Sequence, residues 1–507
     1  MNRSSNIELS QNDIYNHVNE VAKNGTEEEK SKLQKTLQNC IKLLQKCPKV
    51  IEADFNKRLL NNDIWMKIIS YLQTKEILTI FNLVCKHFHS LATDSHAIKI
   101  LELKNINTIY QHQNVMKVLN RSTTIRKLTI ENCDEYLNRI IKCGLKSNSM
   151  LKSLEVSNNL PYPRRMHLSA TTFLNIRNLG IHLENVGFQK ITYENSNFEV
   201  IANLKNLKSL KLTDQSFSFE SGPTITQEFI KRLRQKSKNL ESIKLLPKVY
   251  VLPDTMIEIS KIQNLTTLFF RESTIDIITP TLILSLAKNC HKLENISFIF
   301  RRDRVSYTDL VLALNDFFNE RKMTLKRLII SIPDDFQSTD TLKNLELCKN
   351  LEEFEGCNLS ITMPLKKFAS FHKLPKLEFL KLGNYFVEGY IYEMLFKHLN
   401  CPFVEKVILR LNGYLDDQML KQLLQKCPNL RYICIDFKSF FTNLSYEYLF
   451  ELCFKEDKLV FFTYEEKDSH TQSLVERYFQ SKDLMVYQRY ITMKEDFVRF
   501  KKNAWYN

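Results

Sequence analysis

The stretch LLQKCPNLRYICIDFKS, residues 423 to 439, decides the fold. A leucine-rich run is followed by a cysteine and then by a phrase in which apolar and polar residues alternate. The same order appears in LAKNCHKLENISFIF (286 to 300) and in LELCKNLEEFEGC (345 to 357). Alternation of this kind predicts a short strand, and the leucine spacing before it predicts a helix.

One sequence phrase, apolar-x-x-apolar-x-apolar, recurs fourteen times between residues 98 and 464, with starts 25 to 33 residues apart. Its fourth and sixth residues are expected to point into a core, as in a strand. One strand and one helix cannot bury their own apolar surface, so the units must stack. The phrases begin at residues 98, 125, 151, 176, 207, 240, 265, 293, 325, 351, 377, 404, 430 and 459.

The residues between the phrases carry helix signals. Asp416 or Asp417 is expected to begin a helix that Pro428 ends, and Thr279 is expected to cap a helix with Pro280 at its first position. Cys290 and Cys427 each stand three residues before the next strand phrase. A small apolar thiol suits such a tight corner, so both cysteines are predicted to be packing residues and not catalytic ones.

These repeats resemble the leucine-rich-repeat family, in particular its helix-bearing, ribonuclease-inhibitor-like class. The resemblance implies an α/β solenoid, a horseshoe with parallel strands inside and helices outside, over residues 98–507 including a C-terminal cap. It also implies that the third, fifth and seventh residues of each phrase face the concave surface, where a protein partner binds.

Residues 59 to 103 lack strand alternation and carry helical apolar stripes, the first with Ile64, Ile68 and Leu72. This stretch resembles an F-box, although Asn61 and Ile98 stand where the family commonly has proline and tryptophan. The resemblance implies an F-box at 57–97, after accessory helices at 1–56, that docks a Skp-family adaptor and through it a cullin. The open alternative is a bundle that caps the first repeat. The expected adaptor-binding residues are Leu60, Ile64, Ile68, Leu72, Leu83, Val84 and Phe88.

Composition limits the remaining possibilities. The formal net charge of +15 favours anionic partners. An N-terminus without an apolar segment and twelve scattered cysteines indicate reduced thiols and a cytoplasmic or nuclear location. No membrane span, cofactor or catalytic motif is expected. Cys85 and His89 lie close in sequence, but without a second ligand pair no metal site is predicted there.

The two resemblances together imply a non-catalytic role as the substrate receptor of an SCF-type cullin–RING ubiquitin ligase. A basic track on the concave face is expected to bind an acidic or phosphorylated protein substrate. The open alternatives are a merely solvated face, a scaffold or inhibitor that acts without a cullin, a nucleic-acid binder, and a target site near Lys406, Arg410 and Tyr432. The predicted target-binding residues are Lys211, Lys244, Phe269, Arg271 and Arg327.

Overall fold

The structure is a computed structural model. It describes residues 99–463, apart from 107–108, 134–135, 159–166, 192–198, 214–223, 246–248, 252, 271–277, 301–306, 332–341, 358–369, 385–396, 412–416 and 437–459. The expected N-terminal helices, F-box and C-terminal cap therefore lie outside the described residues. The chain forms two compact units, Met1–Thr224 with Arg232–Leu240, and Ile225–Lys231 with Glu241–Asn507.

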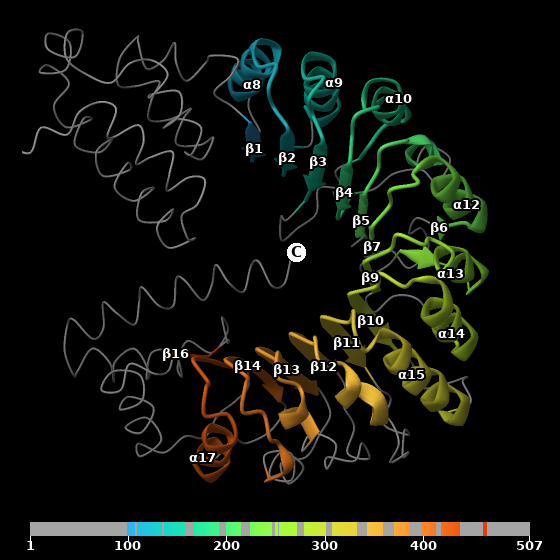
Figure 1. Cartoon of the computed structure of the whole chain (residues 1–507). Helices are drawn as coiled ribbons and strands as arrows, with labels where there is room; N and C mark the ends of the chain where they lie inside the picture. The colour runs from blue at the N-terminus through green and yellow to red at the C-terminus, as the bar shows by residue number, and fades with distance from the viewer. Residues whose placement is uncertain are drawn as a thin grey trace, which may run out of the picture. The chain divides into compact units, whose positions relative to one another are not determined.

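The described part of the first unit contains five parallel strands whose order in the sheet is their order in the sequence. Helices precede or follow these strands along the chain and form a separate layer beside them (Figure 1). The elements are β1 (Ile100–Lys104), α8 (Ile109–Arg121), β2 (Lys127–Glu131), α9 (Leu137–Ser147), β3 (Ser153–Ser157), α10 (Ala170–Leu179), β4 (Asn185–Gln189), the 3₁₀ helix η2 (Glu199–Asn203) and β5 (Ser209–Thr213).

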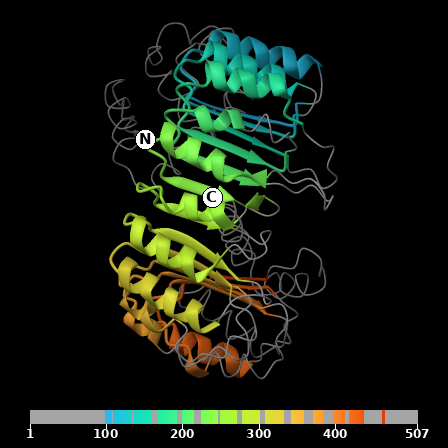
Figure 2. The same cartoon turned by 90° about the vertical axis from the view of Figure 1, so that its right-hand side faces the viewer.

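The described part of the second unit repeats the plan with nine parallel strands, again in sequence order (Figure 2). Helix α12 (Gln227–Lys236) is divided between the units, and β6 (Thr224–Ile225) pairs with β8 (Tyr250–Val251) in a separate small sheet. The repeat elements are β7 (Ser242–Leu245), α13 (Pro253–Ile259), β9 (Thr267–Phe270), α14 (Pro280–Asn289), β10 (Asn295–Ile299), α15 (Tyr307–Arg321), β11 (Arg327–Ser331), η3 (Lys343–Leu347), β12 (Glu353–Cys357), β13 (Phe379–Asn384), β14 (Lys406–Leu411), α17 (Asp417–Lys426), β15 (Tyr432–Asp436) and β16 (Val460–Thr463).

The core lies between strands and helices, where the sequence alternation places it. In β1 buried and exposed residues alternate strictly, and Leu101 and Leu103 are the buried ones. The equivalent fourth and sixth residues of later strands, such as Leu128 and Ile130 in β2, are also buried. Each unit thus has the architecture of a leucine-rich-repeat solenoid, which confirms the predicted fold class.

The strands β2 to β5 and β9 to β15 each begin with the same pair of hydrogen bonds to the preceding strand. The carbonyl of Lys326, just before β11, accepts from the backbone N–H groups of Glu352 and Glu353 at 2.8 and 3.0 Å. The carbonyl of Glu352 in turn accepts from Glu378 and Phe379, both at 3.0 Å. Because the bond recurs from repeat to repeat, it fixes a register in which residues at equivalent phrase positions lie side by side.

The recurring cysteine closes the corner between helix and strand. The carbonyl of Cys290 accepts from the N–H of Leu293 at 3.1 Å, and its thiol donates to the carbonyl of Ser260 in the preceding repeat at 3.2 Å. Cys427 makes the same backbone turn with Leu430. Both side chains are buried, so the predicted packing role of Cys290 and Cys427 is confirmed.

Two helix starts behave as predicted. Thr279 accepts a hydrogen bond from the N–H of Leu282 at 3.2 Å, with Pro280 as the first residue of α14. Helix α17 begins at Asp417, the second of the two candidate positions, and ends before Cys427 and Pro428.

One phrase was misassigned. IRNLGI, 176 to 181, is not a strand, because Ile176 to Leu179 form the end of α10 and Gly180 follows as its cap. The first two apolar residues of the phrase are three apart, a spacing that also fits a helix stripe. The correct phrase is LENVGF, 183 to 188, which leads into β4 at Asn185–Gln189, where Asn185 pairs in register with Ser153. The last phrase is shifted by one residue, since Val460 aligns with Tyr432 at the third position.

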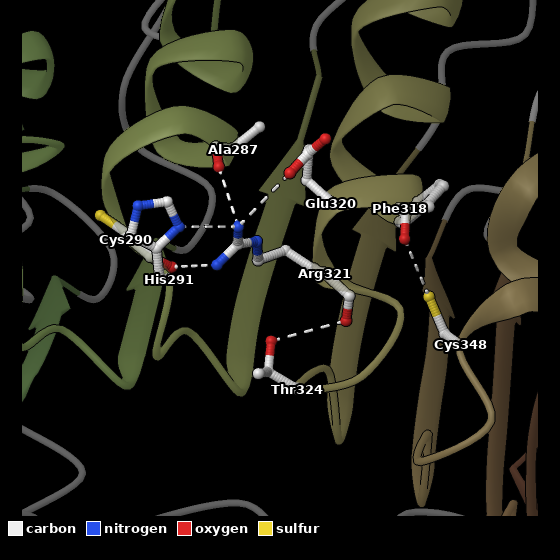
Figure 3. A network of polar contacts seen from close by, with 8 residues as sticks. All are labelled: Ala287, Cys290, His291, Phe318, Glu320, Arg321, Thr324 and Cys348. Carbon is white, nitrogen blue, oxygen red and sulfur yellow. Dashed lines mark hydrogen bonds and ion pairs between the residues drawn. The ribbon is translucent and has the colours of Figure 1, made fainter.

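A buried arginine joins two neighbouring repeats of the second unit (Figure 3). Arg321, at the end of α15, is 3% exposed and donates to the carbonyls of Cys290 and Ala287 at 2.8 and 3.0 Å. These carbonyls belong to the C-terminal end of α14, where backbone acceptors lack partners within the helix. His291 Nδ1 lies 3.2 Å from the same guanidinium. Arg321 therefore caps the helix of the preceding repeat from the side.

Replacing Arg321 with leucine should lower the free energy of unfolding by about 2–4 kcal/mol, because two buried carbonyls lose charged donors. Urea denaturation of the full chain, followed by circular dichroism, measures the change. The control is Lys322→Leu, the exposed next residue, which should stay within about 0.5 kcal/mol of the parent. Equal effects of the two substitutions would contradict the capping role.

Candidate functional site

The predicted target-binding residues fall into two groups. Lys244, Phe269 and Arg327 lie on β7, β9 and β11 of the second unit, whereas Lys211 lies on β5 of the first. Arg271 lies outside the described residues, as do all seven predicted adaptor-binding residues. Within the described residues, the predicted basic residues therefore do not all lie in one continuous row across neighbouring strands.

Phe269 is the centre of the group in the second unit. It pairs in register with Lys244 on the neighbouring strand, and the Lys244 Nζ atom lies 5.7 Å from the centroid of its ring. The guanidinium carbon of Arg327 lies 5.2 Å from the same centroid. A cation over an aromatic face contributes roughly 0.5–2 kcal/mol, depending on how far it is desolvated. Phe269 is only 8% exposed, so the ring holds both cations in place from a largely covered position.

Acidic residues lie directly beside this cluster. Arg327 Nε lies 2.9 Å from a carboxylate oxygen of Glu353, its register partner on β12. On the next strand pair the order of charges is reversed, and Glu355 forms an ion pair with Lys381. Glu353 is thus joined to the basic cluster by a cross-strand ion pair, and Glu355 is joined to Lys381.

Burial differs sharply between these two ion pairs. The side chains of Lys381 and Glu355 are 7% and 13% exposed, whereas those of Arg327 and Glu353 are 20% and 41% exposed. In a buried ion pair, the attraction between the charges is largely offset by the cost of desolvating them. Loss of either partner then leaves an uncompensated buried charge. Lys381–Glu355 is therefore a fixed structural pair, and the Lys244–Phe269–Arg327 cluster is the better candidate for reading a ligand's charge.

Lys211 has different surroundings. Its register neighbour on β4 is Gly187, and the next residue in that row is Glu155, which pairs with Lys127 at 3.0 Å. A Cβ at Gly187 would lie 3.4 Å from Glu155 Cγ and 3.8 Å from Lys211 Cβ, so the glycine leaves a notch between acid and base. Burial lowers the pKa of Lys211, Glu155 opposes this shift, and Lys127 adds to it.

The residues that form the notch share one position in the repeat. Glu155, Gly187 and Lys211 occupy the same position in successive strands once β4 is placed at LENVGF. The misassignment of that strand hid the row. The aromatic contact of Lys406 with Tyr432, whose ring centroid lies 5.9 Å from Nζ, fell within the alternative site near the C-terminal repeats.

Three further properties hold for the described residues. Within them no group of three or more His, Cys, Asp or Glu residues could hold a metal ion. In the same ranges no helix has the length and apolarity needed to cross a bilayer. Burial raises the pKa of Cys133 to about 11 and those of Cys290 and Cys348 to about 12. Such thiols stay protonated at neutral pH and are poor nucleophiles.

Comparison with known proteins identifies the segment ahead of the repeats. The F-box domain family matches residues 59–98, so the chain carries an F-box domain that ends just before β1. This match covers the stretch that contains the predicted adaptor-binding residues.

Comparison with solved structures also gives matches of low sequence identity. A chain of the yeast Rad7 and Elc1 complex is 14% identical, with 82% of this chain and 92% of that chain covered and a TM-score of 0.44. The TLR13–ssRNA13 complex is 13% identical, with 80% and 59% covered and a TM-score of 0.30. Comparison with curated proteins gives no match.

Native protein treated with iodoacetamide at pH 8 should remain unmodified at Cys133, Cys290 and Cys348, because only a small fraction of each thiol is ionised when the pKa is about 11 or 12. Peptide mass spectrometry reads each site separately. The same sample in 8 M urea should be labelled at all three. Rapid labelling of the folded protein at Cys290 would contradict its role as a buried corner residue.

Proposed function

We propose that this protein is the substrate-recognition subunit of an SCF-type ubiquitin ligase. Its F-box docks a Skp-family adaptor, which links the chain to a cullin, and its repeats bind the protein to be ubiquitinated. The observation that carries the proposal is the order of parts, an F-box domain at residues 59–98 followed directly by a strand–helix solenoid.

The proposed mechanism is proximity. The repeat units hold a target so that its lysines meet a ubiquitin-loaded enzyme at a high effective concentration, and no covalent step occurs on this chain. The protonated, buried thiols of Cys290 and Cys348 agree with such a role, since a ubiquitin-carrying cysteine needs an accessible thiolate. A cytoplasmic or nuclear location belongs to the same proposal, because six described cysteines are all free thiols.

The target-binding part of the proposal rests on the Lys244–Phe269–Arg327 cluster. Two cations fixed on one aromatic ring present positive charge in a defined geometry, which lowers the entropy lost when an acidic or phosphorylated segment binds. Glu353 pairs with Arg327 and competes with such a ligand. A doubly charged phosphate competes better for the guanidinium than a single carboxylate does, so the proposal favours a phosphorylated target.

Changing Ile64 and Leu72 together to aspartate should abolish co-purification of adaptor and cullin, because the family resemblance places both on an apolar docking stripe and burying an unpaired charge is costly. Immunoblotting of the purified complex measures recovery. Leu312→Asp, on a residue that is 59% exposed in α15, is the control and should retain both partners. Unchanged recovery from the double variant would leave a capping bundle as the better account of residues 59–98.

Lys244→Glu with Arg327→Glu should remove the target while retaining the adaptor, because the charge offered to the ligand changes sign. Target capture is measured from cells with the Ile64 and Leu72 changes present to prevent degradation, and adaptor recovery is measured in the same charge variant without those two changes. The control reverses Lys288 and Lys322, which are exposed in the same unit and change the net charge equally. If the cluster variant captures the same proteins as its parent, target binding occurs elsewhere on the repeats.

A further inference from the structure

One edge of the first unit is unusually rich in cations. It is the edge at which helices end and strands begin, and the chain returns to it at each turn between a helix and the next strand. We call it the basic edge and define it by Lys99, Arg121, Arg126, Lys146, Lys152, Arg177, Lys205, Lys208, Lys236 and Lys238.

Hydrogen bonds show that these turns lie side by side. The Arg126 N–H donates to the carbonyl of Lys99 at 2.7 Å, and the Lys152 N–H donates to that of Arg126 at 2.8 Å. Asn206 donates its side-chain amide to the carbonyl of Ile181 at 2.8 Å. The Ser237 hydroxyl donates to the carbonyl of Leu204, which joins the end of α12 to the turn after η2.

Acidic compensation at this edge is small. The turns 121–126, 146–152, 177–184, 204–208 and 236–238 contain one carboxylate, Glu184. Glu184 is shared by Lys152 and Lys208 at 2.6 and 2.9 Å, and its pKa is lowered chiefly by those two hydrogen bonds. Lys99, Arg126 and Lys205 are exposed and make no ion pair with any residue in the described ranges.

Helix dipoles account for only part of this charge. A cation in the last turn of a helix stabilises it, which explains Arg121, Lys146 and Arg177. The second unit also has basic last turns, yet most of its described strand starts carry carboxylates. The position just before each strand is occupied by Lys99, Arg126 and Lys208 in the first unit. In the second unit the same position is occupied by residues such as Glu294, Glu352, Glu378 and Glu405. Among the described strands, positive strand starts therefore predominate in the first unit, where Glu184 is the exception, whereas in the second unit only Lys326 and Arg431 are basic at this position.

The surface favours a protein over a nucleic acid. Met150 and Ile181, 45% and 54% exposed, lie in the same turns and offer aliphatic contacts between the cations. The turns contain no Phe, Tyr or Trp on which a base could stack, and His182 is their one aromatic ring. Helices present their C-terminal, electronegative ends here, whereas phosphates are favoured at N-terminal ends.

We propose that the basic edge is a second interaction surface, which binds a protein segment carrying carboxylates around aliphatic side chains. Its cations pair with the carboxylates, and Met150 and Ile181 cover the aliphatic groups. This inference is independent of the F-box and of the Lys244–Phe269–Arg327 cluster.

The test measures fluorescence anisotropy of the full chain with a labelled 18-residue peptide of repeated Glu-Glu-Leu. An all-glutamate peptide and an 18-base-pair DNA duplex serve as comparison probes. Lys99→Glu with Arg126→Glu and Lys205→Glu should weaken peptide binding about tenfold or more, since each exposed ion pair contributes a few-fold. None of these three residues lies in a helix, so the reversal leaves helix dipoles unchanged.

The matched control reverses Lys292, Lys349 and Lys376, exposed residues in the equivalent turns of the second unit. It should leave binding within about twofold, and Met150→Ser with Ile181→Ser should remove the preference for leucine-containing over all-glutamate peptide. If both reversal variants lose peptide affinity equally, binding depends only on the net charge of the protein, and the proposal is overturned. Tighter binding of the duplex than of the peptide, or no peptide binding, would overturn it as well.

Discussion

The hydrogen bond from the start of one strand to the start of the next is the constraint on which this molecule depends. A single carbonyl, such as that of Lys326, accepts two N–H groups from the following repeat. The shared acceptor leaves no freedom to slide the strands, and a slip of one residue would turn every core side chain to the wrong face. The buried leucines and phenylalanines of successive repeats then form a continuous row in each unit.

The same register creates the binding surfaces. Residues at one phrase position form a row, so Lys244 meets Phe269 and Arg327 meets Glu353 although about 25 residues separate each pair in sequence. Charge along such a row is set repeat by repeat. Exposed positions of such a row can vary without disturbing the core, whereas Phe269 and Lys381 are largely buried. Arg321 contributes to stability and not to a binding surface. Its buried guanidinium joins the helices of two neighbouring repeats through hydrogen bonds.

Much of the fold could be predicted from the sequence, because the same pattern of strand and helix residues recurs in many repeats. The strand phrases, the Thr279 cap and the buried Cys290 corner each follow from local chemistry. The phrase at 176 misled because its apolar spacing fits a helix as well as a strand. Contacts between repeats were harder to predict. The Lys381–Glu355 pair and the Arg321 cap depend on register and helix packing, which no single repeat encodes.

The proposed role of the repeats depends on the F-box at residues 59–98, because the F-box would connect a target bound to the repeats with the ubiquitin ligase. The most direct test combines the purified full chain with a Skp-family adaptor and determines the molar mass of the mixture by light scattering after size exclusion. The account predicts one stable species containing one copy of each protein. Two separately eluting proteins at micromolar concentration would contradict it.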